Sequence, residues 1–138
     1  MRQKIRLITL FFLMVFCAGM NASAAPPEWN VLLITVDTLR YDRISFHTDK
    51  YVHTPNMDWL ARKSQVFSHA YSHAPVTLPS HISIFTGTTP LYHGISDNPG
   101  YRLGDRFYTI AEYFKDKGYA TGAFVGAIPV DSRYGLNQ

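Results

Sequence analysis

The 138-residue chain is long enough for one domain or for part of one. Its 46% hydrophobic, 14% aromatic and 17% charged residues are ordinary globular content, which excludes a disordered, collagen-like or disulfide-dense protein. Of the 13 Lys and Arg side chains, three precede residue 25, a stretch that has no Asp or Glu. The remainder therefore carries ten basic and ten acidic side chains, and bulk charge gives no support for nucleic-acid binding.

The first 24 residues have the three-part pattern of a secretory signal peptide: a basic start, an apolar run to Ala18, and small residues up to Ala24. We expect cleavage after Ala24, because a cut one residue later would place Pro26 directly after the broken bond. The alternative is an uncleaved membrane anchor, although the apolar run is shorter than the roughly 20 residues of a spanning helix. The prediction is an exported protein, periplasmic or secreted, that meets the membrane only through its export signal. Cys17, the only cysteine, would leave with that signal, so the mature chain would have no disulfide and no Cys-bound metal.

The next elements in chain order are a strand, a helix and a second strand. Residues 30–36 form a short, nearly all-apolar, β-branched run, which is typical of a strand buried on both faces of a parallel sheet. Thr54 and Pro55 predict the start of a helix, with Thr54 as N-cap and Pro55 at the first helical position. Residues 66–71 are a second strand candidate.

The following elements complete the same alternation. Residues 78–86 are apolar and long enough for a helix that stops at Gly87. Thr109 and Glu112 form a capping box that opens a helix ending at Gly118, and residues 119–126 are a third strand candidate. The order predicts an α/β fold with a mostly parallel sheet and helices on both faces. With so few strands, residues 25–138 are expected to be the N-terminal part of a larger domain, incomplete at its C-terminus.

Asp37 is the first candidate for chemistry, since it follows the first predicted strand. Ligands of open parallel sheets bind beyond the carboxyl ends of the strands, so a carboxylate there is well placed to hold a divalent metal. Thr38, Arg40 and Asp42 follow it closely. The alternative is an Asp that only caps a loop.

The second candidate is A-P-V-T-L-P-S-H at residues 74–81. Thr77 is expected just before the helix, where free N–H groups and the helix dipole favour an oxyanion or a phosphate-like group. Beside a bound metal its hydroxyl could also lose its proton and act as a nucleophile. Alternatively, Thr77 or Ser80 serves only as an N-cap.

The third candidate is the histidine set. All six histidines fall between residues 47 and 93, but no pair has the helical H-E-x-x-H arrangement, so a zinc site made from them alone is weakly supported. Most are expected to be structural or to face the substrate. Residues 93–98 predict a turn, with Asn98 as a candidate donor to a bound oxyanion. The six are His47, His53, His69, His73, His81 and His93.

Four blocks of the sequence then occur in order: N-V-L-L-I-T-V-D-T-L-R at 30–40, T-P-N-M-D-W-L-A at 54–61, A-P-V-T-L-P-S-H-I-S-I-F-T-G at 74–87 and H-G-I-S-D-N at 93–98. Together they resemble the N-terminal part of sulfatases of the alkaline phosphatase superfamily. The resemblance implies a large α/β sandwich that hydrolyses sulfate or phosphate esters at a metal site. It also implies that Asp37 and Thr77 contact the metal, that Thr77 is the nucleophile, and that His81 and Asn98 contact the sulfuryl or phosphoryl oxygens.

The nucleophile frame departs from that of ordinary sulfatases, which carry C-x-P-x-R or S-x-P-x-R and oxidise its first residue to formylglycine. Here the frame is T-L-P-S-H, and Thr cannot give the same aldehyde. Thr38 also stands where many sulfatases have a second Asp. The T-L-P-S-H frame resembles that of nucleotide pyrophosphatases/phosphodiesterases of the same superfamily. Two further features resemble that branch: D-x-x-R-x-D at 37–42, and Asn98 placed 21 residues beyond Thr77.

The sequence therefore predicts an exported, metal-dependent ester hydrolase of the sulfatase family that acts on a small-molecule or glycan ester. The alternatives are a phosphodiesterase-like phosphoryl hydrolase and a truncated, non-catalytic fragment that at most binds anions. Calcium is the expected metal for a sulfatase, and zinc for a phosphodiesterase-like enzyme. Because one carboxylate and one hydroxyl are too few to hold a metal firmly, we expect the 138-residue chain alone to be inactive.

Overall fold

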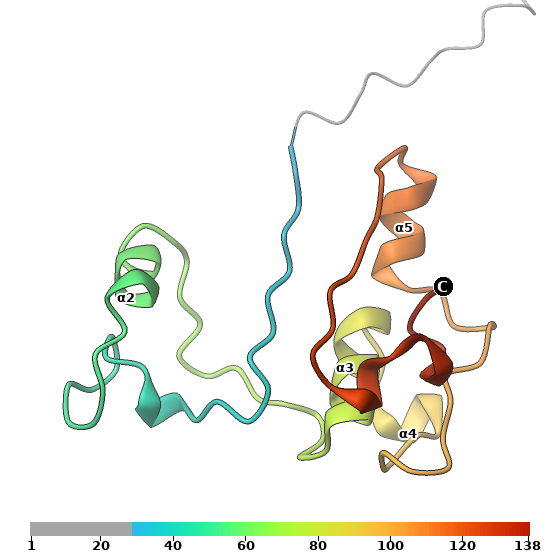
Figure 1. Ribbon diagram of the computed structural model, residues 1–138, viewed down its shortest axis with the longest axis horizontal. Helices are drawn as coiled ribbons and strands as arrows, with labels where there is room; N and C mark the ends of the chain where they lie inside the picture. Colours follow the sequence, from blue (N-terminus) through green and yellow to red (C-terminus); the bar gives the residue numbers. More distant parts are fainter. Residues whose placement is uncertain (1–28) are drawn as a thin grey trace, which may run out of the picture.

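The computed structural model describes residues 29–138, and the predicted signal peptide at residues 1–24 lies outside them. The described chain consists of short helices joined by long irregular segments, and it contains no strand (Figure 1). None of its helices is long and apolar enough to cross a membrane. In chain order the elements are η1 (Tyr41–Arg43), α2 (Pro55–Ala61), α3 (Thr77–Thr86), α4 (Pro90–His93), α5 (Ile110–Asp116), η2 (Ile128–Val130) and η3 (Ser132–Tyr134).

The hydrophobic core is built around α3. Leu78 and Ile82 lie one turn apart on that helix, are fully buried, and cluster with Ile95, Leu103 and Phe107. Burial of a side chain of this size is worth roughly 1.5–3 kcal/mol. Helix α3 also contacts α4, α5 and η2, which surround it in Figure 1. The helix that begins with Thr77 is therefore the best-anchored element of the described chain.

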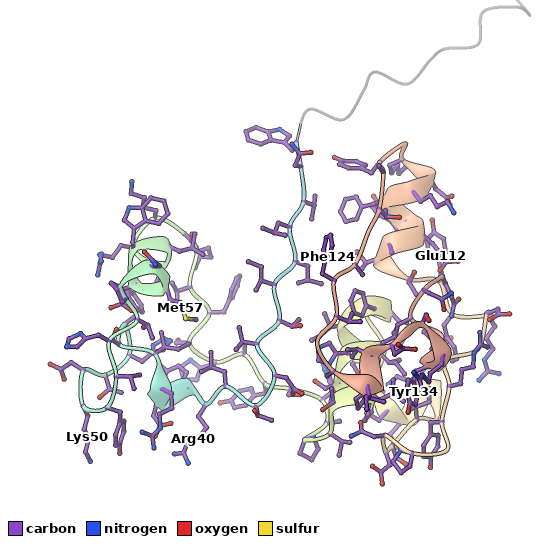
Figure 2. All side chains as sticks on the ribbon, in the orientation of Figure 1. Arg40, Lys50, Met57, Glu112, Phe124 and Tyr134 are labelled. Carbon is purple, nitrogen blue, oxygen red and sulfur yellow. The ribbon has the colours of Figure 1, made fainter. Side chains whose placement is uncertain are left out.

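The last residues pack back onto this core. Tyr134, labelled in Figure 2, and Leu136 lie against the buried cluster. The N–H of Leu103 donates to the carbonyl of Tyr134 at 2.9 Å. Gly135 has a φ of +82°, and a Cβ at this position would overlap the carbonyl oxygen of Leu103. Only glycine fits here, because the backbone of two segments meets at this point.

Predicted local signals set several helix ends. The hydroxyl of Thr109 accepts from the N–H of Glu112, whose carboxylate accepts from the N–H of Thr109 at 2.7 Å, so the predicted capping box is confirmed. Gly87, with a φ of +66°, ends α3 as predicted. Helix α5 ends at Asp116 instead of the predicted Gly118, whose φ is +86°. Helix α4 was not predicted, although it begins with the same Thr-Pro pair as α2: Thr89 is its N-cap and Pro90 its first residue.

Helix α2 stands apart from the other helices in Figure 1 and buries none of its residues. It begins at Pro55 as predicted, and Thr54 is its N-cap. The hydroxyl of Thr54, however, caps no helix N–H; it donates to Oδ1 of Asp58 at 3.0 Å. The Ser45 hydroxyl donates to Oδ2 of Asp58 at 2.7 Å and is the main reason that the pKa of Asp58 lies below its usual value. Polar bonds therefore hold this region together, without a buried core.

The three predicted strands, at 30–36, 66–71 and 119–126, have no strand pairing within residues 29–138. Most of their apolar side chains are exposed, such as Leu32, which is 82% exposed, and Phe124, which Figure 2 labels. A strand is defined by its bonds to a neighbouring strand, and the described residues supply no paired neighbour. The α/β fold with a mostly parallel sheet therefore stays a prediction.

Candidate active site at the start of helix α3

Asp37 and Thr77, 40 positions apart in the chain, meet in the structure. The hydroxyl of Thr77 donates to Oδ2 of Asp37 at 3.0 Å. Thr77 is the first residue of α3 and half-buried, whereas Asp37 is exposed. The sequence placed Thr77 just before the helix, with Thr77 or Ser80 as a possible N-cap; both placements are wrong, because Val76 in an extended conformation is the N-cap. As the first residue of the helix, Thr77 has its hydroxyl at the positive end of the helix dipole, which also stabilises the nearby Asp37 carboxylate.

A turn positions the Asp37 carboxylate. The N–H of Leu39 bonds the carbonyl of Val36 at 3.4 Å, and Thr38, the third residue of this turn, has a φ of +58°. Gly or Asn normally occupies such a position, and a left-handed conformation costs a β-branched residue about 1–2 kcal/mol. Strain of this kind persists where the surrounding structure imposes it, and functional sites are common places for it. Here the strained residue directly follows the predicted metal ligand.

The backbone donors at the start of α3 are partly taken. The N–H of Leu78 donates to Oδ1 of Asn98 at 2.8 Å, Pro79 has no N–H, and the N–H of Ser80 bonds within the first turn. Within residues 29–138, the N–H of Thr77 and the amide NH2 of Asn98 have no partner. With Oδ1 engaged, Asn98 can still donate through that NH2. One donor on Thr77 itself and one on Asn98, which bonds the next residue of α3, therefore remain available to an oxyanion.

His81 is buried, and its two ring nitrogens both have protein partners. Nδ1 donates to the carbonyl of Thr77 at 2.8 Å, because a carbonyl oxygen can only accept. A ring whose single proton is on Nδ1 leaves Nε2 to accept from the hydroxyl of Thr35, 3.1 Å away. The predicted contact of His81 with a substrate oxygen would require one of these bonds to break. Sequence reasoning missed Thr35, although it is the only polar residue in the run 31–36.

The other predicted participants lie elsewhere. Arg40 and Asp42 bind each other through two bonds of 2.8 Å, and the bond from Arg40 is the main cause that lowers the pKa of Asp42. His93 is buried: its Nδ1 accepts from the N–H of Ile95 at 3.1 Å, and its Nε2 donates to the hydroxyl of Ser83 at 3.2 Å. Burial lowers the pKa of His93. These side chains bond within their own parts of the chain, and within residues 29–138 none of them is hydrogen-bonded to Asp37 or Thr77.

Asp37 and Thr77 offer two oxygen ligands of the kind that calcium and magnesium prefer. Calcium binds about six to eight oxygens, so this pair fits as part of a ligand set. In the part of the chain that the structure describes, no group of three or more His, Cys, Asp or Glu side chains could hold a metal ion. The described residues therefore do not form a complete metal site.

The model of the sulfatase family matches residues 29–128, which is most of the chain. The chain belongs to the sulfatase family. The family predicted from the four sequence blocks is thus confirmed, and the match includes Asp37, Thr77, His81 and Asn98.

Several sulfatases are similar to this chain. Iduronate 2-sulfatase of Mus musculus is 38% identical over 112 residues, which are 77% of this chain and 20% of that protein. N-acetylgalactosamine-6-sulfatase of Homo sapiens is 30% identical, over 80% of this chain and 19% of the relative. Arylsulfatase of Clostridium perfringens (strain 13 / Type A) is 35% identical, over 67% of this chain and 19% of the relative. The chain thus spans about a fifth of the length of these relatives, and no solved structure gives a significant match.

Proposed function

We propose that the intact protein hydrolyses sulfate esters and that Thr77 is its nucleophile. The observation that carries this proposal is the 3.0 Å hydrogen bond from the Thr77 hydroxyl to Asp37, at the N-terminus of a well-packed helix in a chain of the sulfatase family. Two relatives are named as sulfatases of iduronate and of N-acetylgalactosamine, which are sugar units. The substrate class proposed here is therefore a small-molecule or glycan sulfate ester.

In the proposed mechanism, Oγ1 of Thr77 attacks the sulfur in line with the ester oxygen, and its proton passes toward Oδ2 of Asp37. The new O–S bond forms as the ester O–S bond breaks, and the alcohol leaves with a proton from water. The hydroxide left by that water then attacks the sulfur of the sulfo-threonine, the Oγ1–S bond breaks, and the proton held at Asp37 returns to Oγ1 of Thr77 as sulfate leaves. The N–H of Thr77 and the amide of Asn98 donate to the sulfuryl oxygens, where negative charge grows.

Asp37 and Thr77 would also be two of the ligands of a divalent cation, calcium in a sulfatase, with further ligands from outside the described residues. Such a cation, when bound, neutralises charge on the ester and lowers the pKa of the nucleophile. Chelation should then abolish turnover, and calcium should restore it better than zinc. Turnover that survives complete removal of metal would contradict this part of the proposal.

Phosphodiester hydrolysis is the second candidate. The observation that favours it is the unmodified Thr77 at the head of T-L-P-S-H, a frame that resembles the phosphodiesterase branch of the superfamily. In that case Thr77 attacks phosphorus by the same in-line geometry, and zinc is the expected metal. The contacts of Thr77, Asp37 and Asn98 serve either ester, because sulfuryl and phosphoryl groups share their tetrahedral shape.

The experiment compares an aryl sulfate and an aryl phosphodiester with the same leaving group, using the intact protein and two variants. Thr77→Val keeps the β-branched shape and removes the hydroxyl, whereas Thr77→Ser keeps the hydroxyl. We expect wild-type protein to prefer the sulfate, and Thr77→Val to lower kcat about 10³-fold or more, with Thr77→Ser retaining part of the activity. A preference for the phosphodiester would favour the second candidate. No turnover of either ester by folded protein would leave a non-catalytic, anion-binding chain.

We further propose that residues 1–24 direct export to the periplasm or the medium. Mass spectrometry of the protein recovered from those fractions should give a mature N-terminus at Ala25. A chain that retains Met1 in the membrane fraction would instead favour the uncleaved anchor.

A further inference from the structure

We propose that His81 is a positioning residue that, through Thr35, sets the geometry of the Asp37–Thr77 pair. The inference rests on the proposed function, because it assigns His81 a task in the reaction of Thr77. Residues 35–37 and the start of α3, residues 77–81, must stay in fixed contact for that reaction. The Asp37–Thr77 bond is one connection between them, and the Thr35–His81 bond is a second.

The two bonds lie at matching positions on the two segments. Thr35 precedes Asp37 by two residues, where the run 30–36 passes into the turn that holds Asp37. His81 follows Thr77 by four residues, and side chains four apart on a helix also share a face. Two residues span at most about 6.6 Å and four helical residues about 6 Å, so the two spacings are similar and both bonds can form at once. Residues 35–37 and α3 are thus joined by two side-chain bonds of 3.0 and 3.1 Å.

His81 also fixes the backbone of the nucleophile. Its Nδ1 donates to the carbonyl of Thr77 at 2.8 Å, while Nε2 accepts from Thr35. His81 is only 8% exposed, so its ring has little room to turn toward a ligand. With both nitrogens engaged, the ring connects the Thr35 hydroxyl to the residue that bears the reacting oxygen. A positioning role, without direct contact to the ester, follows from this arrangement.

Loss of this connection should slow the chemical step and leave substrate binding unchanged. A displacement of a reacting group by about 1 Å can cost about 10²-fold in rate. Thr35 is exposed, and its replacement creates no cavity in the core. The effect of changing it should therefore appear in kcat rather than in KM or in Tm.

The test uses the intact protein with Thr35→Val, which keeps the shape and removes the donor, and Thr35→Ser, which keeps the donor. We expect Thr35→Val to lower kcat about 10- to 100-fold with unchanged KM and Tm, and Thr35→Ser to restore it. Thr121→Val, in another exposed segment, is the matched control and should behave as wild type. His81→Asn keeps a donor near Nδ1 and lacks Nε2, so adding Thr35→Val to it should lower kcat no further.

A spectroscopic measurement is independent of activity. Nitrogen-15 NMR of the wild-type ring should show the neutral His81 tautomer with the proton on Nδ1. Each of three results would overturn the inference: a proton on Nε2, wild-type kcat in Thr35→Val, or a joint fall of kcat and Tm that Thr35→Ser does not rescue. Wild-type protein that hydrolyses neither ester refutes the proposed function itself, whereas active wild type with an unaffected Thr35→Val refutes only the role of His81.

Discussion

Gly135→Ala should be the most destabilising single glycine substitution in the C-terminal part of the described chain. Gly135 is buried, has a φ of +82°, and a Cβ there would overlap the carbonyl oxygen of Leu103 and lie 3.2 Å from the Cβ of Leu103. The Leu103 backbone cannot retreat freely, since its N–H donates to the carbonyl of Tyr134 at 2.9 Å. The substitution therefore combines backbone strain with overpacking beside a fully buried core residue.

Two other glycines separate these contributions. Gly118 has a φ of +86° and nothing within 4 Å of an added Cβ, so Gly118→Ala carries only the left-handed backbone cost of about 1–2 kcal/mol. Gly104 has neither feature, and Gly104→Ala should change the free energy of unfolding by about 0.5 kcal/mol or less. At Gly135 overpacking adds about 1–3 kcal/mol, for a loss of about 2–5 kcal/mol.

Urea unfolding followed by circular dichroism measures this series. With a slope of about 1–3 kcal/mol per molar urea, Gly135→Ala should lower the midpoint by about 0.5 M or more relative to Gly104→Ala, at an unchanged slope. A midpoint for Gly135→Ala equal to that of Gly118→Ala would refute the close packing of the chain end on Leu103.

Three further predictions concern stability. Burial holds the pKa of His93 below its usual 6.5, so the unfolded chain binds more protons than the folded chain below that pH. The contribution of His93 to stability should therefore be complete above about pH 6.5 and fall as the pH drops toward the lower folded pKa. His93→Gln should flatten this dependence of Tm on pH. Hydrogen bonds, chiefly from Ser45, hold the pKa of Asp58 below its usual 3.8. The contribution of Asp58 to stability is therefore present above that pH and lost as the pH falls through the folded pKa. Asp58→Asn should lower Tm at neutral pH, and adding Ser45→Ala to it should lower Tm little further. Thr38→Asn should raise the free energy of unfolding by about 1 kcal/mol, because Asn tolerates the left-handed conformation; an unchanged urea midpoint would show that Thr38 is not strained.

Helix ends could be predicted where their determinants are local. The capping box of Thr109 and the stop at Gly87 need only a few neighbouring residues, and both form as predicted. The hydroxyl of Thr54 shows the limit of such signals, because Ser45, nine positions earlier, binds it instead of a helix N–H. The predicted strands depend on pairing with distant segments, which a local apolar run cannot supply.

The candidate site was predictable only in part, for the same reason. Asp37 and Thr77 were each singled out from local patterns, but their contact spans 40 positions and was implied only by the family resemblance. The partners of His81 depend on how two segments meet, so its hydrogen bond to Thr35 required the structure. A polar residue inside an apolar run is the signal that could have directed attention to Thr35.

The role of Thr77 as the nucleophile is tested most directly by trapping a covalent adduct. The intact protein is mixed with an aryl sulfate, quenched with denaturant during the first turnover, digested, and its peptides are sequenced by mass spectrometry. A sulfo group on Thr77, absent from Thr77→Val, is the predicted result. An active protein whose adduct lies on another residue, or that turns over the ester with no adduct on Thr77, would contradict it.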